Sequence, residues 1–238
     1  MVGSFLNVVI HRVPLGESIV TPRSRCPGCE KQIASRDNLP IVSWLMLRGR
    51  CRHCSQPISA RYPIVEALTA LTFFAVALTR GLDADLALQL PFAAMLIAVA
   101  AIDLDHRIVP NRILLPAAVW AVGASAVLRP GELPELALAG AGAFLLLLVA
   151  ALARPGGMGM GDVKLAGTMG LFLGASVAPA LLVAFGGGAA VGIAIMARHG
   201  AQERKRGIPF APFLALGGLV GLLAGPELID LYTSQFLD

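Results

Sequence analysis

Six stretches of the chain contain no Asp, Glu, Lys or Arg, and this feature constrains the fold more than any other. A helix that crosses a bilayer needs about 20 mainly apolar residues, because the hydrocarbon core offers the backbone no water to pair with. Charged residues make up only 14% of the chain, whereas a soluble domain carries about 25%. The apolar stretches run continuously and do not alternate with polar residues as in a β-barrel. The sequence therefore predicts an all-α integral membrane protein, a polytopic helix bundle, and excludes an intrinsically disordered chain.

The longest of these stretches and the apolar N-terminal segment need interpretation before the spans can be counted. The stretch 165–197 is too long for one span, and Gly174, Ser176 and Pro179 near its middle predict two shorter helices. Residues 1–10 are apolar but too short to span, and we expect them to be the end of a helix whose beginning is missing. We thus expect about eight spans, the first truncated. They are 1–10, 64–79, 86–102, 113–128, 136–153, 163–177, 179–197 and 207–226.

The distribution of positive charge predicts the orientation of these spans. When the connecting segments are assigned alternately to the two sides, every Lys and Arg except Arg80 and Arg129 falls on the side of segment 11–63. Cytoplasmic loops of membrane proteins carry such an excess of Lys and Arg. We therefore expect three parts: the first helix end (1–10), a small cytoplasmic module (11–63) and a transmembrane bundle (64–238).

All four cysteines lie in the predicted cytoplasmic module, as the pairs Cys26-x-x-Cys29 and Cys51-x-x-Cys54. The 21 residues between the pairs are close to the spacing of a zinc ribbon. Four thiolates can hold one tetrahedral Zn²⁺ and leave no position for a water, which predicts a structural metal site. Two disulfides are the first alternative, which a reducing cytosol disfavours. A redox dithiol is the second, which the presence of two matched pairs disfavours.

Carboxylates at two predicted span boundaries are candidates for catalysis. Asp103 and Asp105 end the span 86–102, and Asp162 begins the span from 163, at the same predicted depth. Two carboxylates at one site can share a proton, so that one activates a water while the other protonates the substrate, as in aspartic proteases. Asp103 and Asp105 are about 200° apart around a helix, so only one of them can face Asp162.

Glycines before Asp162 strengthen this interpretation. Gly159 and Gly161 carry no side chain, which would allow an extended substrate backbone to approach the carboxylate. Taken singly, Asp162 could also be a helix cap, and Asp103 and Asp105 could be interface charges beside Arg107. Their matched depth and the glycine-rich approach together favour a catalytic pair.

Several motifs in this order resemble the bacterial type IV prepilin peptidases, membrane aspartyl proteases with a Gly-x-Gly-Asp motif. The motifs are Gly3-Ser4-Phe5-Leu6-Asn7, the two cysteine pairs, Asp103 with Pro110 seven residues later, Gly159-Met160-Gly161-Asp162, and Pro209-Phe210-Ala211-Pro212-Phe213. The resemblance implies that Asp103, not Asp105, pairs with Asp162 as the catalytic carboxylates.

The resemblance also implies a substrate and a compartment. Such enzymes cut the leader of type IV prepilins or type II secretion pseudopilins at the cytoplasmic edge of the bacterial inner membrane. Members with the four-Cys module usually then methylate the new N-terminal residue with S-adenosylmethionine. We therefore expect Zn²⁺ and S-adenosylmethionine as cofactors, and prepilins and the bilayer, not nucleic acid, as partners.

Two other functions are compatible with parts of the sequence. Buried carboxylates also serve proton relays, so a proton-coupled transporter is possible, although transporter sites lie near the bilayer midplane. A noncatalytic membrane adaptor that binds a partner through its zinc ribbon would explain the cysteines. It gives no reason for Gly159 and Gly161 before Asp162.

Overall fold

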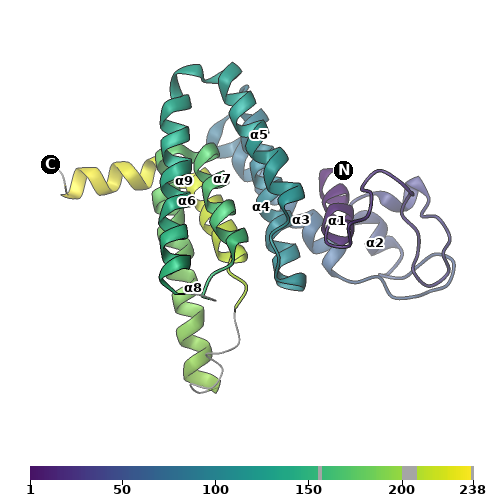
Figure 1. The fold of residues 1–238 in the computed structure, drawn as a ribbon. Helices are drawn as coiled ribbons and strands as arrows, with labels where there is room; N and C mark the ends of the chain where they lie inside the picture. Colours follow the sequence, from purple (N-terminus) through teal and green to yellow (C-terminus); the bar gives the residue numbers. More distant parts are fainter. Residues whose placement is uncertain (155–156, 200–207, 237–238) are drawn as a thin grey trace. The chain divides into compact units, whose positions relative to one another are not determined.

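The computed structural model describes residues 1–154, 157–199 and 208–236, and helices dominate these ranges. The chain divides into two compact units, 1–74 and 75–238, which are described separately (Figure 1). The structure confirms the predicted all-α membrane bundle. Within the described residues, six stretches are long and apolar enough to cross a membrane, which makes the chain a multi-pass membrane protein.

The first unit consists of a helix pair and an irregular module. It contains α1 (Val2–Arg12), the 3₁₀ turn η1 (Ser35–Asn38), α2 (Val42–Met46) and the first part of α3 (Arg61–Arg80). A Cβ added at Gly3 would lie 2.8 Å from the Cα atom of Glu66, so α1 lies against α3 at close range. The Ser4 hydroxyl donates to Glu66, and the Asn7 amide donates to the Tyr62 carbonyl at 3.1 Å. The two helices therefore run antiparallel.

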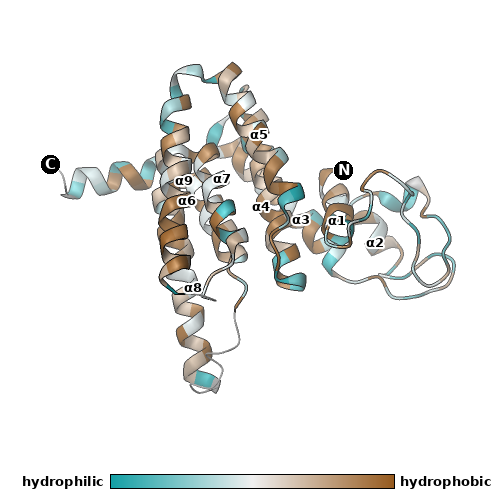
Figure 2. Cartoon of the chain, in the orientation of Figure 1, coloured by the Kyte–Doolittle hydropathy of each residue, from teal (hydrophilic) through white to brown (hydrophobic). Residues whose placement is uncertain are grey.

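The second unit is the membrane bundle. It contains the end of α3, then α4 (Leu86–His106), α5 (Asn111–Leu128), η2 (Pro130–Glu132), α6 (Leu133–Ala153), α7 (Met160–Leu173), η3 (Gly174–Ser176), α8 (Val177–His199) and α9 (Ala211–Phe236). Figure 2 shows that apolar residues dominate these helices, whereas polar residues gather at their connections. The pairs α6–α7, α8–α9 and α4–α9 form the main contacts.

The structure confirms the predicted break within the longest apolar stretch. The 3₁₀ turn η3 separates α7 from α8, and its first residue, Gly174, has φ +56°. Glycines of α9 contact α7 and α8 in opposite orders along the chain. The pairs are Gly218 with Met169 and Gly221 with Leu173 for α7, and Gly221 with Ala180 and Gly217 with Ala184 for α8. The chain thus reverses at η3, and α7 and α8 are antiparallel.

Several helices extend beyond the charge-free stretches from which they were predicted, whereas α7 (predicted at 163–177) begins at Met160 and already ends at Leu173. α4 continues to His106, α3 begins at Arg61, and α9 extends to Phe236. A helix continues through the interface, where charged side chains reach water, so the first charge does not mark its end. The basic residues Arg204, Lys205 and Arg206 and the predicted start of the last span at 207 lie outside the described residues.

Small residues allow the helices of the bundle to approach closely. A Cβ added at Gly170 of α7 would lie 2.6 Å from the Ala139 carbonyl oxygen of α6. A Cβ added at Gly217 of α9 would lie 2.1 Å from the Ala180 carbonyl oxygen of α8. Such contacts are typical of membrane helices, where backbone approach replaces the hydrophobic effect as the source of association. α4 is the most buried span of the bundle.

Prolines lie inside three of the membrane helices, and at two of them, Pro91 and Pro226, the carbonyl that loses its helical partner is bound by another donor. Pro91 in α4 has no N–H for the Ala87 carbonyl, and Pro226 in α9 has none for that of Leu222. Donors from neighbouring helices bind both carbonyls. The Trp120 indole N–H donates to Ala87 at 2.8 Å, and Arg80 Nε donates to Leu222 at 2.8 Å. Figure 1 shows that α9 bends near its C-terminal end, as expected at a proline.

The Trp120 indole should matter only as long as Pro91 is present. We expect Trp120→Phe to lower the free energy of unfolding by about 1 kcal/mol, the usual net value of a hydrogen bond. In a Pro91→Ala background residue 91 supplies its own N–H to Ala87, so the same substitution should cost clearly less. Reversible unfolding in detergent measures both effects. Equal costs in the two backgrounds would contradict this role for the indole.

Candidate active site

The two predicted aspartates lie at the same end of the membrane bundle. Asp103 is in the last turn of α4, with 5% of its surface exposed, whereas Asp105 is exposed. Asp162 is the third residue of α7, with 8% exposed. The carboxylates of Asp103 and Asp162 are close enough to interact electrostatically. The helix geometry thus buries Asp103 beside Asp162 and turns Asp105 away, as expected for residues two positions apart.

The beginning of α9 holds Asp103 in place. The backbone N–H of Ala211, the first residue of α9, donates to Asp103 Oδ2 at 3.1 Å. The next residue, Pro212, has no N–H, and the N–H of Phe213 is bonded to the Phe210 carbonyl. Ala211 is therefore the donor that the first turn of α9 presents to the carboxylate. Sequence reasoning missed this contact, although the prolines at 209 and 212 mark the turn that makes it.

Asp162 is held by its own helix. Its Oδ2 atom accepts a hydrogen bond from the backbone N–H of Gly159, the N-cap of α7, at 3.3 Å. A Cβ at Gly159 would lie 3.3 Å from this oxygen. The capping role weighed from the sequence is therefore present, at the third helical position, and it coexists with burial beside Asp103. Each aspartate therefore accepts a backbone N–H at its Oδ2 atom, Asp103 from Ala211 and Asp162 from Gly159.

Gly161 makes room for another part of the chain. A Cβ at this position would lie 2.7 Å from the Cβ and 3.2 Å from the Cγ2 atom of Val109, in the link between α4 and α5. The glycine thus lets the link that follows Asp103 pack against the first turn of α7. Lys164 Nζ donates to Asn111 Oδ1 at 3.2 Å and joins the start of α5 to the same turn. A role of Gly159 and Gly161 in substrate approach stays a prediction.

The four cysteines of the first unit form a second cluster. Their sulfur atoms all lie within 4.8 Å of one another, and the thiols are free. The Cys26 and Cys54 sulfurs are 3.7 Å apart, close to the roughly 3.8 Å expected between ligands at 2.3 Å from a tetrahedral Zn²⁺. Four close cysteines of this kind can hold a metal ion.

The two halves of the cluster repeat one backbone pattern. In the first half, the backbone N–H of Cys26 donates to the Lys31 backbone carbonyl. In the second half, the backbone N–H of Cys51 donates to the Gln56 backbone carbonyl. An isolated bridge flanks each half, Arg25 with Gln32 and Arg50 with Pro57. The residue after the second cysteine has positive φ in both, at Glu30 and Ser55. Each half therefore presents its two thiols from the same tight turn.

The ionisation of these thiols fits a bound cation. Backbone N–H groups of Cys54 and His53 stabilise the Cys51 thiolate and lower the pKa of Cys51 to about 6. The N–H of Gln56 favours the Cys54 thiolate, but partial desolvation and the neighbouring sulfurs outweigh it and raise the pKa of Cys54 to about 11. Four adjacent thiols cannot all ionise alone, because their charges repel one another. A divalent cation removes this repulsion.

Comparison with known proteins identifies two family matches. The Bacterial Peptidase A24 N-terminal domain matches residues 1–80, and the Type IV leader peptidase family matches residues 90–196. The first match covers the cysteine cluster, and the second covers both aspartates. No solved structure matches the chain.

Two of the curated relatives match the whole chain, and a third matches about half of it. A protein of Aeromonas hydrophila named Prepilin leader peptidase/N-methyltransferase is 36% identical over 272 residues, which cover 100% of this chain and 92% of the relative. One of Bacillus subtilis (strain 168) with the same name is 34% identical, covering 100% and 96%. A third, of Myxococcus xanthus (strain DK1622), is 54% identical over 115 residues, 48% of this chain and 34% of the relative.

The contact between Gly161 and Val109 can be tested by adding a Cβ atom at position 161 and then removing the one at position 109. Gly161→Ala should destabilise the fold by about 1–3 kcal/mol, the cost of overpacking, and should displace Asp162 from Asp103. Adding Val109→Gly removes the opposing Cβ, so the double variant should regain stability. Unfolding in detergent is the measurement. Gly142→Ala is the matched control, since a Cβ there meets nothing within 4 Å.

The double variant also separates the two interpretations of Gly161. If the glycine serves packing, the activity assigned to the aspartates should return together with stability. A double variant that is as stable as the parent but inactive would contradict the packing interpretation and favour substrate approach.

Proposed function

Because this chain belongs to the type IV leader peptidase family, we propose that it is a membrane aspartyl endopeptidase that removes the leader of type IV prepilins or type II secretion pseudopilins. The observation that carries the proposal is the pair of buried carboxylates, Asp103 and Asp162, at one end of the bundle. Their positions in α4 and α7 fall within the part of the chain, 90–196, that matches the family. The relatives' names supply the substrate class.

The chemistry follows from two carboxylates that share one proton. The ionised carboxylate takes a proton from a water, whose oxygen attacks the scissile carbonyl carbon. The protonated carboxylate gives its proton to the carbonyl oxygen. When the tetrahedral intermediate collapses, the C–N bond breaks and the leaving amine receives a proton. The donors from Ala211 and Gly159 support this proposal, because they fix each carboxylate before the substrate arrives.

The proposed cleavage point is the cytoplasmic edge of the bacterial inner membrane. Asp103 lies near the end of α4 and Asp162 near the start of α7, which are both boundaries of apolar spans. The excess of Lys and Arg on this side supports the cytoplasmic assignment. A substrate helix can remain in the bilayer while its leader unwinds at the boundary, where water satisfies the freed backbone groups.

We further propose that Cys26, Cys29, Cys51 and Cys54 hold a structural Zn²⁺ in a cytoplasmic module. The sulfur geometry and the repeated turns support a tetrahedral site without an open position. When bound, the cation cross-links the two cysteine pairs and so stabilises a segment that has only a small hydrophobic core. It takes no part in peptide cleavage.

A second activity is N-methylation of the residue exposed by cleavage. It is supported by the relatives' names, which include N-methyltransferase. S-adenosylmethionine would supply the methyl group, which moves from the sulfonium sulfur to the neutral amine as the amine loses a proton. We assign no residue to this cofactor among the described parts of the chain.

Each proposed catalytic aspartate should be essential. Asp103→Asn and Asp162→Asn should each lower cleavage of a prepilin by about 10²–10⁴-fold or more, the contribution of a general acid or base. Asp105→Asn is the matched control and should stay active, because Asp105 is exposed. Mass spectrometry of the new N-terminus measures cleavage. An active Asp103→Asn protein with an inactive Asp105→Asn protein would contradict the assignment.

The cysteine cluster should bind one metal ion. We expect about one zinc per chain in the purified protein, from four ligands on one tetrahedral ion. Cys29→Ser and Cys54→Ser should each lower the zinc content and the thermal stability, with a smaller effect on cleavage. Elemental analysis and a melting curve check this. Two disulfides without metal would disprove the site.

A further inference from the structure

The short helix α2 and Leu39 just before it carry an apolar surface that the protein leaves exposed. Leu39, Val42, Leu45 and Met46 each expose more than half of their surface. The other side of this segment is occupied: Ser43 is buried, and the Trp44 indole N–H donates to the Ile58 carbonyl at 3.1 Å. α2 is therefore one-sided, with its polar contacts turned inward. An exposed apolar patch of this kind marks a contact with a partner or with lipid.

A hydrogen bond fixes α2 at the level where α3 enters the membrane. The backbone N–H of Ile41, the N-cap of α2, donates to Glu66 Oε2 at 2.8 Å, and Glu66 Oε1 accepts from Ser4 of α1. Glu66 is five residues beyond Arg61, the first residue of α3, which corresponds to about 7–8 Å along the helix. Ile64 and Leu68, two residues before and two residues after Glu66, are themselves exposed apolar residues of this span. The apolar sides of α2 and α3 thus begin at one depth.

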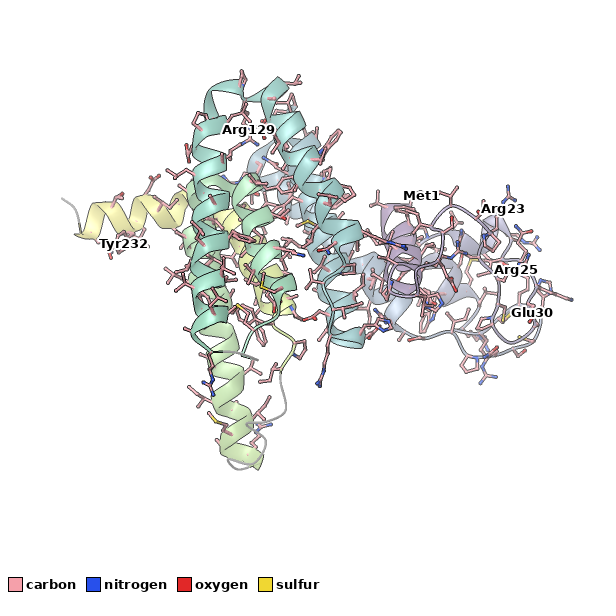
Figure 3. All side chains as sticks on the ribbon, in the orientation of Figure 1. Met1, Arg23, Arg25, Glu30, Arg129 and Tyr232 are labelled. Carbon is pink, nitrogen blue, oxygen red and sulfur yellow. The ribbon has the colours of Figure 1, made fainter. Side chains whose placement is uncertain are left out.

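The charges around α2 suit an anionic lipid surface. Between Asp37 and Glu66 the sequence has no acidic residue, whereas Arg48 and Arg50 follow α2 directly and are exposed. Asp37 is itself paired with Arg52. Elsewhere in the same module Arg23 and Arg25 also project outward (Figure 3). Exposed arginines beside apolar side chains are typical of segments that lie in the headgroup region.

We propose that α2 lies in the bilayer interface, with Leu39, Val42, Leu45 and Met46 in the boundary between headgroups and acyl chains and Arg48 and Arg50 against anionic phosphates. The segment acts as an additional membrane attachment for the cysteine module, beside α1 and α3. The role requires only that α3 spans the membrane, so it is independent of the peptidase activity.

Site-specific photocross-linking tests this location in the full-length protein. Benzoylphenylalanine replaces Met46, which is 77% exposed, or Val20, an equally apolar control in the same module that is 80% exposed. Val20 lines a hollow with Val8 and Arg12 of α1. These two residues follow Ser4 by one and two turns of α1, so we expect position 20 to lie farther from the membrane than α2. The protein is placed in vesicles of phosphatidylglycerol and phosphatidylcholine, irradiated and analysed by mass spectrometry.

We expect lipid adducts at position 46 in several-fold excess over position 20, and fewer of them when Arg48 and Arg50 are changed to Glu. Benzoylphenylalanine at Leu45 provides a second reporter if the first variant is unstable. Equal adduct yields at 46 and 20 would overturn the proposal. Cross-links from position 46 to another part of the chain, to a second copy or to a prepilin would also overturn it.

Discussion

The bond from the Ala211 N–H to Asp103 joins a carboxylate of the proposed active site to the first residue of the last helix. α9 in turn packs against α4, α7 and α8, so the position of this one donor depends on most of the bundle. The start of α9 is fixed in addition by Phe210, whose ring stacks on Phe185 of α8 at a centroid distance of 5.6 Å. A shift of α9 would therefore move an oxygen of Asp103 relative to Asp162. Close packing throughout the bundle is what keeps the two carboxylates in register.

Close packing here depends on glycine, and this explains how a short helix can carry Asp162. α7 is only 14 residues long, less than the approximately 20 needed to span a bilayer. It packs against α6, and Gly170 of α7 and Gly140 of α6 allow the two backbones to touch. A side chain at either position would separate the helices and tilt the turn that contains Asp162. The glycine-rich composition thus serves the geometry of the site as well as membrane insertion.

The sequence predicted properties that follow from local pattern. Charge-free stretches gave the membrane bundle, Gly174 and Ser176 marked the reversal between α7 and α8, and the cysteine spacing predicted the sulfur cluster. Contacts between distant segments could not be predicted in this way. Val109 opposite Gly161, and the Ala211 N–H on Asp103, depend on how helices approach one another. Any residue except proline can donate a backbone N–H, so the residue type at position 211 does not reveal the donor. The sequence therefore indicates Asp103 but not the group that orients it.

The repeated turns around Cys26 and Cys51 have a consequence for how the first unit assembles. Each turn offers two sulfurs, so either half alone could only bind a cation as a weak two-coordinate chelate, whereas both together surround it. Capture of a cation by one half would raise the local concentration of the other half's ligands, and binding by both halves would join segments 25–32 and 50–57 in a single cooperative step. The 3₁₀ turn and α2 lie between these segments in sequence. A cation bound by both halves would therefore also restrict the conformations of the loop that carries α2.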